Sequence, residues 1–153
     1  MPKKIPSAAT PPVPLLTHRG VVYPWQCDHV GHMNVMWYVS KFDEATWSLF
    51  TAIGVTPSYV REQRRGMAAV HQSIDYMREV LPGDALYVRS WVVEVREKVI
   101  RFVHEMINAE KEEVAARTEL TAVHLDLVKR KSCPFPKEII EKALALRREE
   151  ETP

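Results

Sequence analysis

The chemically richest part of the chain runs from residue 28 to residue 34 and reads Asp-His-Val-Gly-His-Met-Asn. Asp28 best suits hydrolysis at a carbonyl carbon, because a carboxylate that is ionised at neutral pH can attack the carbon or accept a proton from an attacking water. An isolated Asp is more simply interpreted as a solvated turn residue that caps its own loop. The pattern of residues around Asp28 favours the catalytic role.

A helix that begins just after this stretch would supply donors for the negative charge that such a reaction places on the acyl oxygen. Asn34 is a good N-cap residue, and the first backbone N–H groups of a helix lack intrahelical partners and lie at the positive end of its dipole. We therefore expect Val35 and Met36 to provide oxyanion donors and Asn34 to place the helix end. Gly31, which has no Cβ, would let the loop backbone pass close to a substrate.

Two histidines flank the glycine of this loop. His32 could orient Asp28 or the substrate carbonyl, or could equally be satisfied by nearby backbone, and His29 has a weaker case because it could point to solvent. The side chains of Asp28, His29 and His32 together also suggest a metal site. Three ligands within five consecutive residues need an unusual loop, however, and neither an HExxH motif nor a cysteine cluster completes the set. We expect no metal.

The elements on either side of the loop follow from periodicity. Residues 15–25 are compatible with a strand. After Asn34, apolar residues recur at spacings of four, three, four and four, which is the period of one helix face, and Gly54 suits the end of that helix. The residues with this spacing are Tyr38, Phe42, Ala45, Leu49 and Ile53. A shorter helical turn is expected over residues 56–64.

The rest of the chain has the residue pattern typical of antiparallel strands. Alternating apolar residues from Val70 to Val80 precede a Pro-Gly-Asp turn at residues 82–84, and three further long strands follow, separated by short turns. These three strands are expected at residues 87–95, 99–107 and 114–128. Residues 137–148 would form a charged C-terminal helix.

This order of elements predicts an α+β domain of two layers, in which one long helix packs on a five-stranded antiparallel sheet. We expect the domain to span residues 15–136. A flexible Pro-rich tail at residues 1–14 would precede it, and the C-terminal helix and tail at residues 137–153 would follow. Uncovered sheet edges predict a homo-oligomer, which is at least a dimer.

The loop and the start of the helix resemble the acyl-CoA thioesterases related to 4-hydroxybenzoyl-CoA thioesterase. In that family an Asp follows the first strand, a Gly-His-x-Asn turn comes next, and a Tyr lies one helical turn further on. Here these are Asp28, residues 31–34 and Tyr38. The similarity in element order extends from about residue 21 to residue 136. The resemblance implies the hotdog fold, in which a curled sheet wraps one long central helix.

The resemblance also implies a reaction, the hydrolysis of an acyl-CoA thioester to free acid and CoA with Asp28 as base or nucleophile. Some members place a catalytic Glu on the long helix, so Glu44, or the neighbouring Asp43, is a reserve candidate that could instead be a solvated helix residue. Tyr38 and Gly31 are candidates for substrate binding, although Tyr38 could equally belong to the core.

A short basic run lies where the last strand is expected to end. Lys129, Arg130 and Lys131 could hold the phosphates of coenzyme A near a seam between subunits. A solvated strand end is at least as good an interpretation of three adjacent basic residues. Apart from coenzyme A as a part of the substrate, we expect no cofactor.

Two other functions compete with thioester hydrolysis. A hotdog hydratase or dehydratase acting on acyl-CoA also works through an Asp and a His. Such enzymes carry a sequence similar to Asp-x-Asn-Pro-x-His, whereas the loop at residues 28–34 has no proline. A non-catalytic acyl-CoA binding module is the other alternative, against which the intact Asp28 loop argues.

Composition limits the partners and the location. The chain has 153 residues and a formal net charge of +1 with both signs mixed along it, so we expect a small-molecule partner and no nucleic acid. Cys27 and Cys133 form neither a CxxC pair nor the dense framework of a secreted domain. No apolar run approaches the ~20 residues that span a bilayer, and no signal-peptide pattern begins the sequence. We expect a cytoplasmic protein with no membrane partner.

Overall fold

The computed structural model describes residues 13–149, so that most of the expected tail, residues 1–12, and residues 150–153 lie outside the described part. The strands are β1 (Leu15–Val21), β2 (Arg65–Tyr76), β3 (Ala85–Val95), β4 (Val99–Asn108), β5 (Glu113–Asp126) and β6 (Lys131–Ser132). The helices are α1 (Val35–Ala52), α2 (Pro57–Gln63) and α3 (Lys137–Ala145), with a 3-10 turn, η1, at Pro24–Gln26.

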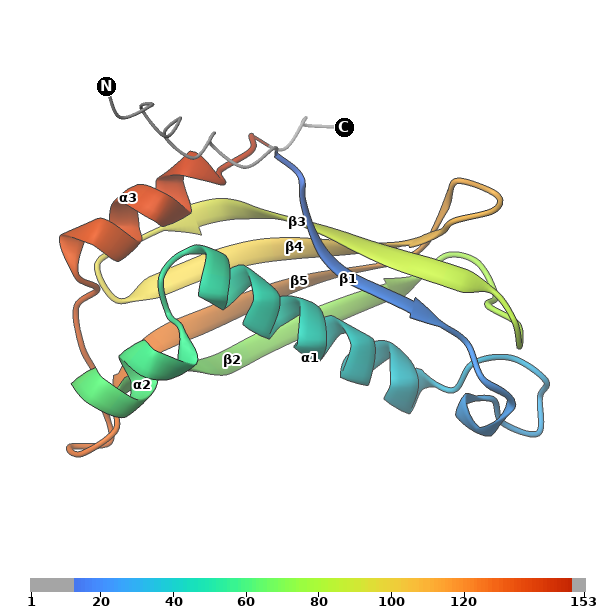
Figure 1. The fold of residues 1–153 in the computed structure, drawn as a ribbon, viewed down its shortest axis with the longest axis horizontal. Helices are drawn as coiled ribbons and strands as arrows, with labels where there is room; N and C mark the ends of the chain where they lie inside the picture. Colours follow the sequence, from blue (N-terminus) through green and yellow to red (C-terminus); the bar gives the residue numbers. More distant parts are fainter. Residues whose placement is uncertain (1–12, 150–153) are drawn as a thin grey trace, which may run out of the picture.

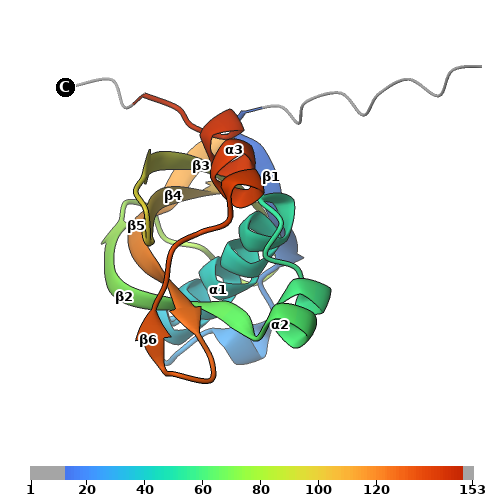
Figure 2. The same cartoon turned by 90° about the vertical axis from the view of Figure 1, so that its left-hand side faces the viewer.

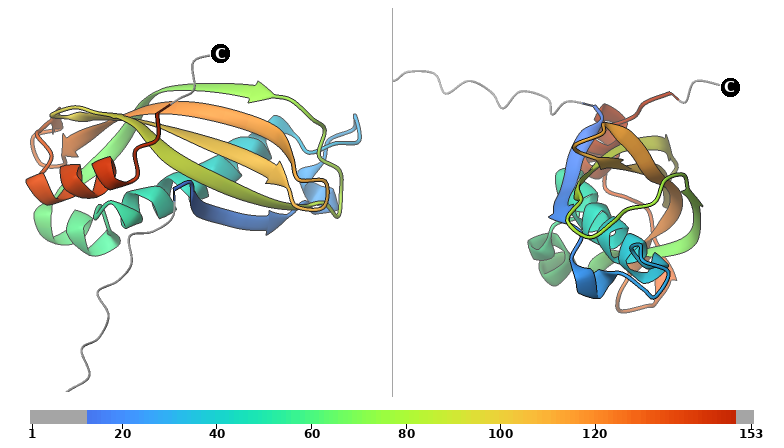
Figure 3. Two further views of the ribbon diagram at one scale, coloured as in Figure 1. Left: turned by 90° about the horizontal axis from the view of Figure 1, so that it is seen from above. Right: turned by 90° about the vertical axis from the view of Figure 1, so that its right-hand side faces the viewer.

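The strands form one antiparallel sheet in the order β1-β3-β4-β5-β2, and the short β6 pairs with β5. The sheet curls around α1, while α2 and α3 lie near the C-terminal end of that helix (Figure 1, Figure 2). The end-on view in Figure 3 shows the strands enclosing α1 over much of its circumference. The expected α+β hotdog fold is confirmed, with β6 as a strand that the sequence pattern did not predict.

The long helix α1 forms where its cap and its periodicity predict it. Asn34 has extended backbone angles, and its side-chain Oδ1 accepts a hydrogen bond from the Met36 N–H at 3.0 Å. Gly54, with a φ of 101°, follows the helix end in the left-handed region that glycine adopts without a steric penalty. All five residues of the predicted apolar face are buried, namely Tyr38, Phe42, Ala45, Leu49 and Ile53.

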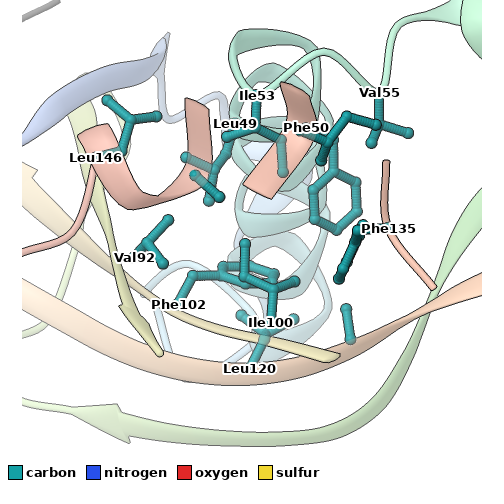
Figure 4. Close-up of a cluster of buried hydrophobic side chains, with 13 residues drawn as sticks. Leu49, Phe50, Ile53, Val55, Val92, Ile100, Phe102, Leu120, Phe135 and Leu146 are labelled. Carbon is teal, nitrogen blue, oxygen red and sulfur yellow. The ribbon is translucent and has the colours of Figure 1, made fainter. Parts of the chain in front are cut away.

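One apolar cluster joins α1, the sheet and α3 around the C-terminal half of the long helix (Figure 4). The Phe50 and Phe102 rings meet edge to face, with their centroids 5.5 Å apart. Ile139 and Leu146 belong to the same cluster, and the Val92 N–H donates to the Leu146 carbonyl at 2.9 Å. The C-terminal helix therefore packs into the same core as the sheet.

Several strand boundaries differ from those expected, by one or two residues in β3, β4 and β5 and by more in β1 and β2. β1 ends at Val21 instead of reaching residue 25, because Pro24 starts η1 and cannot donate to a strand ladder. β2 begins at Arg65 and ends at Tyr76. Val80, which alternation had assigned to this strand, lies in the following loop, fully buried, with its carbonyl accepting the Met33 N–H at 2.8 Å.

A chain of hydrogen-bonded side chains crosses the core and ties α1 to three strands. His104 is completely buried on β4, 2.9 Å from Thr46 Oγ1 through Nε2 and 2.5 Å from Ser90 Oγ through Nδ1. Ser90 Oγ lies 2.7 Å from Thr17 Oγ1 on β1. A neutral imidazole donates at one nitrogen and accepts at the other, so it satisfies both hydroxyl neighbours without carrying charge. Burial lowers the pKa of His104 to about 3.

This buried histidine should make the fold sensitive to acid. An unfolded histidine binds a proton below about pH 6.5 and folded His104 does not, so its contribution to stability is complete above pH 6.5 and falls as the pH drops towards 3. Below pH 6.5 the free energy of unfolding of the wild type should fall as the pH is lowered. We expect this slope to be smaller in His104→Gln by about 1 kcal/mol per pH unit. Urea unfolding at pH 7.5, 6.5 and 5.5 measures the two slopes.

Equal slopes for the wild type and His104→Gln would contradict this role. If the variant is too unstable to measure, NMR titration of the His104 ring in the wild type gives the same answer, since a folded-state pKa near 6.5 would exclude the mechanism.

Candidate active site

The loop that carries Asp28 is closed by its own backbone. The Asp28 N–H donates to the His32 carbonyl at 3.0 Å, and the Gly31 N–H donates to the Asp28 carbonyl at 3.0 Å. Gly31 makes this turn possible because its φ is 95°, a conformation that a side chain with a Cβ disfavours. No other atom lies within 4 Å of where its Cβ would be, so conformation, and not crowding, calls for glycine here.

Both oxygens of the Asp28 carboxylate accept hydrogen bonds. Asn34 Nδ2 donates to Oδ2 at 3.0 Å, and the Val30 N–H donates to Oδ1 at 2.9 Å. These two hydrogen bonds hold the pKa of Asp28 below its ordinary value, and the bond from the Asn34 amide has the larger effect. The carboxylate is therefore ionised at neutral pH, with a fifth of its side-chain surface exposed. Asn34 both caps α1 and fixes Asp28, which is more than the capping role expected of it.

The N-terminus of α1 leaves one of the two expected oxyanion donors free. The Met36 N–H is taken by Asn34 Oδ1, and the Trp37 N–H donates to the Asn34 carbonyl at 2.9 Å. Within residues 13–149, the Val35 N–H has no hydrogen-bond partner. Val35 is thus the helix amide available to a ligand, next to the residue that holds Asp28.

His32 lies between two carboxylates. Its Nδ1 is 3.1 Å from Glu79 Oε1, and its Nε2 is 3.9 Å from Asp28 Oδ1. The ring is half-buried, while the Glu79 side chain is 71% exposed. Glu79 comes from the loop between β2 and β3, 47 residues after His32, and no local pattern in the sequence predicted the contact.

A cavity of about 250 Å³ opens beside this loop. It is lined by His32, Met33, Val35, Tyr38, Tyr76, Met77, Arg78 and Glu79. The Tyr38 and Tyr76 rings meet edge to face in its wall, with centroids 5.0 Å apart. Burial is the main cause that raises the pKa of Tyr38 to about 12, so its hydroxyl stays neutral. Tyr38 is therefore both a core residue and part of the cavity, and Tyr76 joins it from the end of β2.

Glu44 is not brought to this loop. It lies about 15 Å along α1 from the helix start, by the rise of 1.5 Å per residue, and its carboxylate is 2.9 Å from His18 Nδ1 on β1. Asp43 is exposed on the outer face of α1. In this structure neither residue contacts Asp28, and the reserve role stays a prediction without geometric support.

The basic run also lies far from the loop within one protomer. Lys129 and Arg130 occupy the turn after β5, and Lys131 begins β6; all three are exposed. In the β2–β5 register this turn adjoins Arg65, whereas Tyr76 lies at the other end of β2. Eleven residues at ~3.3 Å each separate the two ends, so within one protomer the basic run lies about 36 Å along β2 from Tyr76.

Two kinds of feature are absent from residues 13–149. No group of three or more His, Cys, Asp or Glu side chains is placed to hold a metal ion. No helix in this part of the chain is long and apolar enough to cross a membrane.

The fold and this site define a class of protein, and comparison with known proteins agrees. The family model of the thioesterase-like superfamily matches residues 22–143. That span contains the Asp28 loop, α1 and all the long strands after it. The chain belongs to the thioesterase-like superfamily and has its hotdog fold.

Similar curated proteins carry one recurring activity in their names. The L-carnitine dehydrogenase/betainyl-CoA thioesterase of Rhizobium meliloti is 31% identical over 115 residues, which are 75% of this chain and 23% of that protein. The chain thus spans about a quarter of the length of this relative. The betainyl-CoA thioesterase of Pseudomonas aeruginosa is 24% identical over 132 residues, covering 86% of this chain and 83% of the relative.

Solved structures share the architecture at lower identity. A Staphylococcus aureus protein in complex with CoA superimposes with a TM-score of 0.82 and 16% identity over 92% of this chain and 91% of its own. The 1,4-dihydroxy-2-naphthoyl-CoA thioesterase of Synechocystis superimposes with a TM-score of 0.73 and 22% identity, over 84% of this chain and 95% of its own. At these identities the likeness shows the fold.

Two variants of Asn34 should separate its two roles. Asn34→Ala removes both the cap and the donor to Asp28, so we expect about 1 kcal/mol lower stability and a higher Asp28 pKa. Asn34→Ser keeps a capping hydroxyl but lacks the amide donor, so it should stay close to wild type in stability while still raising the Asp28 pKa. Thermal unfolding and NMR titration of the Asp28 carboxyl measure the two effects.

An Asp28 pKa that is unchanged in both variants would show that the amide contact does not hold the carboxylate. Equal stabilities for the wild type and Asn34→Ala would argue against the capping role.

Proposed function

We propose that this chain hydrolyses acyl-CoA thioesters, with Asp28 as the base or nucleophile and the Val35 N–H as an oxyanion donor. The observation that carries the proposal is the placement of an unpartnered helix amide, that of Val35, in the wall of a cavity, next to the residue that holds the ionised Asp28 carboxylate. Membership of the thioesterase-like superfamily supports the same reaction.

In the general-base route, Asp28 accepts a proton from water as the water oxygen bonds to the thioester carbon. The carbonyl electron pair moves to the acyl oxygen, where the Val35 N–H and the positive end of α1 stabilise the charge. When the carbonyl re-forms, the carbon–sulfur bond breaks, and the CoA sulfur takes the proton back from Asp28. In the nucleophilic route, an Asp28 oxygen bonds to the thioester carbon and the carbon–sulfur bond breaks, which releases CoA as the thiolate and leaves a mixed anhydride on Asp28. Water then cleaves the anhydride to the free acid and the Asp28 carboxylate, and the proton that is set free protonates the thiolate. His32 is placed to orient Asp28 in either route.

The names of the relatives suggest the acyl group to test first. The names of proteins 31% and 24% identical to this chain include betainyl-CoA thioesterase, and the cavity beside His32 is small. We propose betainyl-CoA, or a comparably short acyl-CoA, as the substrate. Neither a metal nor a tightly bound cofactor enters the proposed steps, so assays can be run with EDTA present.

The working form that we propose is a homo-oligomer. β2 ends the strand order and leaves an open edge whose side chains are largely exposed, including Val70 and Tyr76. An exposed edge of twelve residues invites pairing with a second copy. Antiparallel pairing of two β2 edges would bring the basic turn at residues 129–131 of one copy towards the Tyr76 end of the other, where CoA phosphates could be bound.

Replacing Asp28 should nearly abolish turnover. We expect Asp28→Asn to fold normally and to lose about 10²–10⁴-fold in kcat, because the amide cannot accept a proton or attack a carbonyl. Thiol release from a panel running from acetyl-CoA to palmitoyl-CoA, with betainyl-CoA and aryl-CoA included, measures the loss. Glu62→Gln, the same change from acid to amide at an exposed α2 position, is the matched control and should retain wild-type rates.

A folded Asp28→Asn protein with near-native kcat would remove Asp28 from the mechanism and direct the test to Glu44. Hydration of an enoyl-CoA without thiol release would favour a hydratase. Tight acyl-CoA binding without either reaction would favour a binding module.

The proposed homo-oligomer should be detectable in solution. Size-exclusion chromatography with light scattering should show a dimer or tetramer of the 17.6 kDa chain at assay concentration. A charged substitution on the open edge, Val70→Lys, should shift the population towards monomer and lower activity with it. Full activity from a monomer would rule out a site shared between subunits.

A further inference from the structure

We infer that the cavity beside His32 selects a small cationic acyl group, with the Tyr38 and Tyr76 rings and the Glu79 carboxylate binding a quaternary ammonium. This inference rests on the proposed hydrolysis of acyl-CoA and assigns substrate selection to residues that contribute nothing to the bond-breaking step.

The aromatic wall is the first observation. The Tyr38 and Tyr76 planes meet at 88° with centroids 5.0 Å apart, and both residues line the cavity. The electron-rich face of an aromatic ring attracts a cation within about 6 Å, and quaternary ammonium groups are recognised in this way. Met33 and Met77 add polarisable sulfur to the same lining.

The charge at the rim is the second observation. Glu79 is held towards the cavity by its 3.1 Å contact with His32 Nδ1, and Asp28 lies 3.9 Å from the other side of that ring. Arg78 also lines the cavity, with its guanidinium donating to the Met77 carbonyl at 3.2 Å. Glu79 is thus the one carboxylate among the residues that line the cavity, and the Arg78 guanidinium is engaged by a backbone carbonyl, so Glu79 is the group placed to pair with a cation.

The size of the cavity is the third observation. Its volume of about 250 Å³ falls below the ~300–1,000 Å³ of pockets that enclose drug-sized ligands. A trimethylammonium group on a short linker fills such a space, and a long fatty chain does not. Val35, whose N–H faces the developing oxyanion in the proposed reaction, lines the same cavity, so the cationic group and the thioester carbon lie one short linker apart.

A pair of substrates of equal shape isolates the effect of charge. Betainyl-CoA and tert-butylacetyl-CoA differ only in a quaternary nitrogen in place of a quaternary carbon. We expect wild-type kcat/KM to be about tenfold or more higher for betainyl-CoA, as a cation over aromatic rings beside a carboxylate requires. The readout is the ratio of the two kcat/KM values, in which effects common to both substrates cancel.

Three variants test the assigned residues. Glu79→Gln keeps an oxygen that can accept from His32 but removes the charge, and it should lower the ratio by about tenfold. Tyr76→Leu should lower the ratio and Tyr76→Phe should preserve it, because the ring face and not the hydroxyl binds the cation. Glu62→Gln, which removes an exposed charge from α2, is the matched control and should leave the ratio unchanged.

The outcomes separate this inference from the proposed function. A wild-type ratio near one, or a ratio that Glu79→Gln and Tyr76→Leu do not change, overturns the cationic pocket and leaves thioester hydrolysis standing. Hydrolysis of other acyl-CoAs without turnover of betainyl-CoA also overturns it. Absence of thiol release from every acyl-CoA of the panel overturns the proposed function itself.

Discussion

The side-chain amide of Asn34 is the contact on which the site depends. Its oxygen accepts from the Met36 N–H and starts α1, and its nitrogen donates to Asp28. A single planar group therefore sets both the helix end and the orientation of the carboxylate, so neither can move without the other. It also uses one helix amide as a cap and leaves the preceding one, on Val35, without a partner. The positive end of the helix is thus kept open beside an ionised acid.

The remainder of the fold keeps this helix end in place. The sheet curls around α1 (Figure 2), and the buried chain through His104 bonds the helix to β1, β3 and β4. Buried polar groups are costly unless every donor and acceptor is satisfied, so a chain of hydroxyls around a neutral imidazole restricts how the helix can sit on the sheet. The apolar cluster at the opposite end of α1 anchors it against α3. The loop that carries Asp28 therefore extends from a rigid support.

The site itself combines local and distant parts. The residues from Asp28 to Val35 form a short contiguous segment whose backbone closes on itself. Selectivity, as we infer it, comes from Tyr76 and Glu79, at the end of β2 and in the loop after it. In the function that we propose, the chemistry belongs to one loop and one helix end, while a separate loop and strand end shape the space for the acyl group. Such a separation would let proteins with this fold vary in substrate while they keep the same loop and helix end.

The sequence by itself determined whatever depends on neighbours along the chain. The Asn34 cap, the apolar face of α1 and the turn at Gly31 are local, so residue type and spacing predict them. The family resemblance predicted the curled sheet, whose strand order is non-local. Only the tertiary structure decided that Glu79 meets His32, that Val80 is buried outside a strand, and that Glu44 pairs away from the loop. These outcomes depend on the registers of strands far apart in sequence, which alternation of apolar residues does not specify.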